Sequence, residues 1–142
     1  MLRAFPMILI AVLIYNALVL GGGVAGSDAP SLLGKHFAIT LFSGDAWSVS
    51  VGDLLVLLGF GLLFVEVIKA TRATQREIVN HALSMLTFVG ALVEFIVLKG
   101  FGTSSFFFLT AMCLFDVVAG YTISIMAAKR DLTMAPHDRH DL

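Results

Sequence analysis

The chain has 142 residues, of which 58% are hydrophobic and only 13% are charged, and its net charge is −1. Soluble domains carry about 25% charged residues, so this chain has too little charge to cover a globular surface in water. The composition predicts an integral membrane protein that forms one compact unit, and the charge gives no support for nucleic-acid binding. The single cysteine, Cys113, cannot form a disulfide within the chain.

Four segments are long and apolar enough to form membrane-spanning helices, each of which needs about 20 mostly apolar residues. They cover about residues 2–22, 51–68, 81–98 and 105–128. The connection from Gly100 to Ser104 is so short that the last two helices should be antiparallel neighbours. We therefore expect an all-α membrane protein, a four-transmembrane-helix antiparallel bundle over residues 1–132, with a polar cytoplasmic tail over residues 133–142.

The first apolar segment has an alternative interpretation. Arg3, the apolar run Met7–Leu20 and the small residues that follow resemble a secretory signal with a cleavage site. Tyr15 and Asn16 interrupt the apolar centre, which is unusual for a signal. This interruption favours a retained helix.

Positive charges are distributed unequally between the two ends of the expected helices. If the N-terminus is cytoplasmic, seven Lys and Arg residues lie inside and two lie outside. The inner residues are Arg3, Lys69, Arg72, Arg76, Lys129, Arg130 and Arg139, and the outer ones are Lys35 and Lys99. This bias predicts that both termini are cytoplasmic.

The outer connection after the first helix has the pattern of a small β-hairpin over about residues 36–50. Phe37, Ile39 and Leu41 alternate with other residues before the turn sequence SGDA, and Trp47 begins a second alternating run. An isolated hairpin is only marginally stable in water, so it must rest on the helices or on lipid headgroups. Trp47, Phe37 and Ile39 are the candidate docking residues, and an irregular amphipathic loop is the alternative.

The segments SGDAWSVSVGDLLVLLGFGLLFVEVIKATR, NHALSMLTFVGALVEF and FFFLTAMCLFDVVAGYTISIMAAKRDL resemble a family of small four-helix bacterial inner-membrane proteins without an established function. The resemblance covers roughly residues 37–132. It implies a bacterial inner membrane, and it supplies no catalytic residue, cofactor or partner.

Asp116 lies near the middle of the fourth expected helix, and Tyr15 and Asn16 lie at a similar depth in the first. An ionised side chain at mid-membrane costs about 2.5–3.5 kcal/mol on insertion scales, so it usually faces protein. If the two helices are neighbours, Asn16 or Tyr15 can hydrogen-bond the Asp116 carboxyl, and burial favours the neutral acid. A structural bond, a proton or ion site and a contact to another subunit are the three interpretations.

Two further groups of charged residues are expected near the helix ends. Glu94, Asp53 and Lys99 fall near the outer ends of their helices and could form one cluster, as a structural pair or as a transport or ligand site. At the inner side, Glu66 and Lys69 have the spacing of a helical ion pair.

His81 begins the third helix at the level of this inner pair, where it could instead sense pH. His137 and His140 in the tail are a weak metal signal. Gly59 and Gly61 suit close helix packing.

The sequence contains no catalytic, zinc-binding or phosphate-binding motif, so we expect neither an enzyme nor a cofactor or metal site. Small size and a patterned outer loop favour an accessory or assembly subunit of a larger bacterial inner-membrane complex. Its expected partners are the lipid bilayer and either another membrane protein or a second copy. The alternative is a small proton-coupled transporter or channel that uses Asp116 and Glu94.

Overall fold

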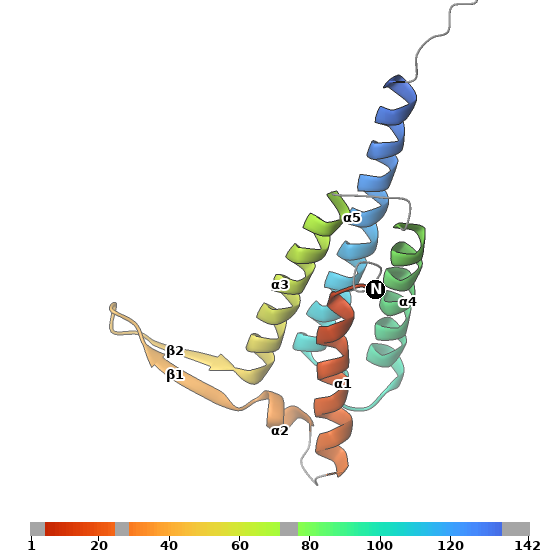
Figure 1. The fold of residues 1–142 in the computed structure, drawn as a ribbon. Coiled ribbons are helices and arrows are strands. Elements are labelled where there is room, and N and C mark those ends of the chain that lie inside the picture. Colours follow the sequence, from red (N-terminus) through yellow and green to blue (C-terminus); the bar gives the residue numbers. More distant parts are fainter. Residues whose placement is uncertain (1–4, 25–28, 72–76, 135–142) are drawn as a thin grey trace, which may run out of the picture.

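The computed structural model describes residues 5–24, 29–71 and 77–134, which are mostly helical with one two-stranded sheet (Figure 1). The elements in chain order are α1 (Ile8–Val24), α2 (Ala29–Leu33), β1 (His36–Thr40), β2 (Ala46–Ser50), α3 (Val51–Thr71), α4 (Glu77–Val97) and α5 (Ser104–Met134).

The long helices α1, α3, α4 and α5 run alternately up and down in one bundle (Figure 1). α5 packs against each of the other three, and α1 also packs against α3. α4 and α5 are antiparallel neighbours joined by a short connection, as the sequence predicts. Gly100 makes the turn in this connection with a φ of 88°, a conformation that side chains with a Cβ rarely adopt.

The bundle has the reverse polarity of a water-soluble protein. Large apolar side chains cover its outside, including Leu57 (66% exposed), Phe64 (64%) and Ile96 (71%). Polar and charged side chains are instead buried between the helices: Glu66, His81, Ser84, Thr87, Thr110 and Asp116. An apolar outer surface around buried polar and charged groups is stable in lipid and unfavourable in water, so the surrounding medium is a bilayer.

Three helices are long and apolar enough to cross that bilayer: α3, residues Val79–Val97 of α4 and residues Ser104–Met126 of α5. The apolar stretch of α1, Ile8–Gly22, is shorter. The 17 residues of α1 rise about 25 Å, less than the hydrocarbon core of about 30 Å. The three-helix membrane region agrees with the expected fold class, and a fourth crossing by α1 stays a prediction.

Helix ends differ from the expected ones because apolar character marks the membrane and not the limits of a helix. α4 begins at Glu77, before the apolar run, and α5 continues to Met134, into the segment predicted to be a tail. Figure 1 shows α5 projecting past α3 and α4. The predicted helix start at residue 2, the arginines 72 and 76 that are expected to be cytoplasmic, and the tail from residue 135 lie outside the described residues.

Gly59 is a point of close helix packing, as expected. A Cβ at Gly59 would lie 2.5 Å from Leu109 Cδ2 of α5, so a larger residue there would force the Leu109 side chain to move. Gly61 has no atom within 4 Å of the same position, and the prediction of close packing at this residue is wrong. Gly61 is two residues beyond Gly59, which turns it about 200° away from α5.

The predicted hairpin is present. β1 and β2 are antiparallel, with Phe37 opposite Val49 and Ile39 opposite Trp47. The turn is closed by hydrogen bonds between Leu41 and both Gly44 and Asp45. The hairpin extends sideways from the first turn of α3, so it projects outward from that end of the bundle (Figure 1).

Candidate functional site

Glu66 is the most completely bonded charged residue in the described part of the bundle. It is 1% exposed, near the end of α3 away from the hairpin. Its Oε2 accepts hydrogen bonds from the backbone N–H of Met7 at 2.9 Å and from Lys69 Nζ at 3.0 Å. Its Oε1 accepts from Asn80 Nδ2 at 2.9 Å. The predicted Glu66–Lys69 ion pair is confirmed, and the carboxylate also ties α1 and α4 to α3.

Lys69 makes a second bond that strengthens this junction. Its Nζ donates to the carbonyl of Phe5 at 3.1 Å, just before α1. The first N–H groups of a helix have no partner within that helix, and Met7 supplies one such group to Glu66. The start of α1 is therefore held by one charge pair on α3.

His81 lies beside α5 and not against the Glu66–Lys69 pair. Its Nε2 is 2.7 Å from Ser124 Oγ, and its ring stacks on Tyr121 with 5.3 Å between centroids. A Cβ at Gly120 would lie 2.6 Å from the imidazole, so the glycine leaves the space that the ring fills. The sequence predicts that His81 lies with the ion pair, but its neighbour Asn80 takes that place. The side chains of Asn80 and His81 point in different directions because successive residues of a helix are rotated by about 100°.

Asp116 is 5% exposed, and its carboxyl is hydrogen-bonded by Ser84 of α4. Its second oxygen, Oδ2, is buried without a hydrogen-bond partner among the described residues. Glu66, His81 and Lys69 are all near enough to act electrostatically on this carboxyl. We call the set Glu66, Lys69, Asn80, His81, Ser84 and Asp116 the carboxylate cluster.

The predicted bond from Asn16 or Tyr15 to Asp116 is wrong. Asn16 Nδ2 donates to Glu94 Oε2 at 3.0 Å and to the carbonyl of Val12 at 3.1 Å. The Tyr15 hydroxyl lies 2.6 Å from Thr103 Oγ1 and donates to the carbonyl of Gly100 at 3.1 Å. α1 is displaced toward the hairpin end of the bundle (Figure 1), so these two side chains miss the middle of α5. We call Tyr15, Asn16, Glu94 and Thr103 the hairpin-end network.

The expected cluster of Glu94, Asp53 and Lys99 is also absent. Glu94 bonds Asn16 instead, and Lys99 is exposed. Asp53 Oδ2 accepts from Ser50 N at 2.8 Å and from Ser50 Oγ at 2.7 Å. Asp53 N donates back to Ser50 Oγ at 3.0 Å, which completes a reciprocal capping box at the start of α3. The role of Asp53 is therefore to join the hairpin to α3 at a fixed angle.

An apolar layer separates the carboxylate cluster from the hairpin-end network. Asp116 on α5 is 13 residues beyond Thr103, which directly precedes that helix, and this interval is about 20 Å along the helix axis. Phe106, Leu109 and Cys113 fill this interval and are fully buried. Thr110, in the same interval, donates to the carbonyl of Phe106 within its own helix. The described residues thus form no continuous polar path between the two ends.

One face of the hairpin is apolar and largely uncovered. Residues opposite each other in a strand pair share a face, so Phe37, Ile39, Trp47 and Val49 lie together, and we call them the hairpin apolar face. Val49 is 8% exposed, whereas Phe37, Ile39 and Trp47 are 50–58% exposed. The other face carries His36, Ala38, Thr40, Ala46, Ser48 and Ser50.

Sequence reasoning missed three of the bonded polar residues. Ser84 follows His81 by three positions and points to the same side of α4, so the helical spacing contained the signal. No comparable spacing in the sequence indicates Asn80 or Thr103. The described residues contain no group of three His, Cys, Asp or Glu side chains that could hold a metal ion.

Comparison of the chain with family models, with curated proteins and with solved structures gives no match.

Proposed function

We propose that the protein is a non-enzymatic accessory or assembly subunit of a larger bacterial inner-membrane complex, related to the small four-helix proteins that its sequence resembles. The hairpin apolar face carries this proposal. Ile39 and Trp47 are half exposed although they lie on a structured element. The capping box between Ser50 and Asp53 fixes that element to α3, so the face is presented in a constant orientation.

The polar interior supports a structural role over transport. The carboxylate cluster joins α1, α3, α4 and α5, and the apolar layer interrupts any polar route toward the hairpin end. A subunit of this kind needs a stable bundle that presents one docking element.

The bias of Lys and Arg supports an orientation with the hairpin outside and both termini cytoplasmic. Cysteines introduced by Ser43→Cys and Thr103→Cys should react with an impermeant thiol reagent added to intact cells, and a cysteine from Thr133→Cys should not. The native Cys113 is buried and adds little background. The reversed labelling pattern would show that the orientation is the opposite one.

The docking role is tested by Trp47→Asp with Ser48→Asp as the matched control. Both changes place the same charge on β2, but only Trp47 belongs to the hairpin apolar face. We expect Trp47→Asp to abolish co-purification with a stoichiometric membrane-protein partner in mild detergent, while Ser48→Asp retains it. Large aromatic side chains commonly dominate such contacts, at 2 kcal/mol or more on truncation.

Both variants must insert at wild-type levels, which membrane fractionation measures. If Trp47→Asp keeps the whole assembly, or if wild-type protein purifies without any partner, the accessory function is contradicted.

A proton-coupled transporter is the second candidate function, and one observation favours it. Asp116 Oδ2 is buried without a partner in the described structure, and His81 lies close to the same carboxyl. Such an arrangement can take up and release a proton. Asp116→Asn separates the two functions, because asparagine cannot titrate.

A further inference from the structure

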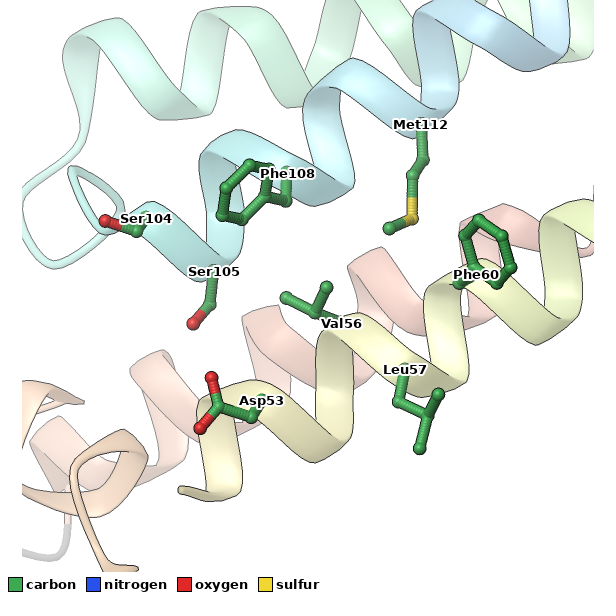
Figure 2. A pocket seen from close by; sticks show the side chains of 8 residues that line it. All are labelled: Asp53, Val56, Leu57, Phe60, Ser104, Ser105, Phe108 and Met112. Atoms are coloured by element: carbon green, nitrogen blue, oxygen red, sulfur yellow. The ribbon is translucent and has the colours of Figure 1, made fainter. Parts of the chain in front are cut away.

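A groove of about 400 Å³ lies on the lipid-facing wall between α3 and α5, at the hairpin end of the bundle (Figure 2). Its walls are apolar along most of its length, and its outer end is polar. The apolar residues are Val56, Leu57, Phe60, Phe108 and Met112, and the polar ones are Asp53, Ser104 and Ser105. Figure 2 shows Asp53 and Ser105 facing each other across this end.

The length of the groove matches a lipid chain better than a helix of another protein. Seven residues separate Asp53 from Phe60 on α3, and seven separate Ser105 from Met112 on α5. Either interval is about 10 Å along the helix. This length lies within one leaflet of a hydrocarbon core about 30 Å thick, whereas a transmembrane helix would pack along most of that thickness.

The polar end of the groove has both a carboxylate and hydroxyl donors. Ser50 uses Oδ2 of Asp53 for the capping box, so Oδ1 is left to accept from a ligand. The hydroxyls of Ser104 and Ser105 have no partner among the described residues. His36 of β1 is the titratable group whose charge acts on Asp53, and it lies on the hairpin side.

We propose that this groove binds one bilayer phospholipid with a primary-amine headgroup. One acyl chain lies between Val56 and Phe108 and extends toward Met112. The ammonium donates to Asp53 Oδ1, and the phosphate oxygens accept from the serine hydroxyls. The charge pattern selects this class, because an anionic headgroup would meet the Asp53 carboxylate and a quaternary ammonium has no N–H to donate.

The test uses the full-length protein in mild detergent and native mass spectrometry with three added lipids of equal chain length. These are phosphatidylethanolamine, phosphatidylcholine and phosphatidylglycerol. We expect one phosphatidylethanolamine per chain, bound about threefold more tightly than the other two, which is the size expected for one exposed ion pair. Asp53→Asn should remove this preference while the acyl chain still binds.

A second pair of variants tests the place of binding. Val56→Phe fills the groove and should abolish retention of the lipid, whereas Leu58→Phe adds the same ring to α3 outside the groove and should not. Three results would each overturn the proposal. The wild type could bind all three lipids equally, both phenylalanine variants could retain the lipid, or a second protein chain could occupy the groove. If Val56→Phe does not fold, the headgroup preference and its loss in Asp53→Asn decide the matter alone.

Discussion

Glu66 and Asp116 are both buried carboxylates in the same cluster, yet their surroundings differ. Glu66 receives three hydrogen bonds, one from a lysine, and both of its oxygens have partners. Asp116 is bonded by Ser84, and one of its oxygens has no partner among the described residues. Depth explains much of the difference, because Glu66 is near a helix end that Lys69 and the start of α1 can reach, and Asp116 is not.

This contrast separates two uses of a buried acid. A carboxylate whose two oxygens both accept hydrogen bonds from other elements connects helices. A carboxylate with an unpaired oxygen makes fewer such connections. Glu66 therefore acts as a structural junction, and among the described residues Asp116 is the buried acid whose chemistry the variants below test.

The largest effect is expected at Glu66. Glu66→Leu leaves the Lys69 ammonium, the Met7 N–H and the Asn80 amide without their acceptor, and breaking a buried ion pair from one side costs about 3–5 kcal/mol. The value should fall at the lower end of that range because the Lys69 side chain is 26% exposed and can turn toward water. Reversible unfolding in mixed micelles measures the loss.

Glu66→Gln is the matched control, because it keeps the shape and one oxygen acceptor but not the charge. It should cost about 1 kcal/mol, the size of a weakened hydrogen bond. If Glu66→Leu were as stable as Glu66→Gln, the junction with α1 and α4 would contribute nothing, and the contrast with Asp116 would disappear.

Much of the fold could be predicted from local sequence pattern. Long apolar segments predict α3, α4 and α5. Apolar residues that alternate with others on both sides of a turn sequence predict the hairpin. The i to i+3 spacing was enough for the Glu66–Lys69 pair, because both partners belong to one helix. These features depend on neighbours along the chain.

The interhelical contacts could not be predicted in the same way. Depth alone predicts that Asn16 bonds Asp116, but Asn16 bonds Glu94 because α1 is displaced along its axis toward the hairpin. A displacement by one turn, about 5.4 Å, is enough to exchange the partners of every polar residue on a helix. Apart from Tyr15 and Asn16, α1 is apolar on all sides, and its sequence does not show at which depth these two residues find their partners.

The smallest effect on stability is expected at Asp116, and it also decides between the two functions. Asp116→Leu removes the acceptor of Ser84, and interhelical hydrogen bonds in membranes average about 0.6 kcal/mol, so the bundle should still fold. Ser84→Ala should cost a similar amount, and the double variant should cost no more than either single one if the bond is all that the two residues share.

Asp116→Asn separates structure from chemistry because asparagine keeps the shape and the hydrogen bond to Ser84 but cannot titrate. If the bond is structural, this variant should match the wild type in thermal stability in detergent and in growth complementation. A proton relay through Asp116 and His81 predicts a folded protein that fails to complement, with the same failure in Asp116→Leu. The accessory function is lost if Asp116→Asn is stable and inactive, since the apolar layer separates this residue from the hairpin end of the bundle, where the proposed docking face lies. If the asparagine variant is fully active, the transporter function is contradicted. The only buried carboxyl oxygen without a partner among the described residues would then be dispensable.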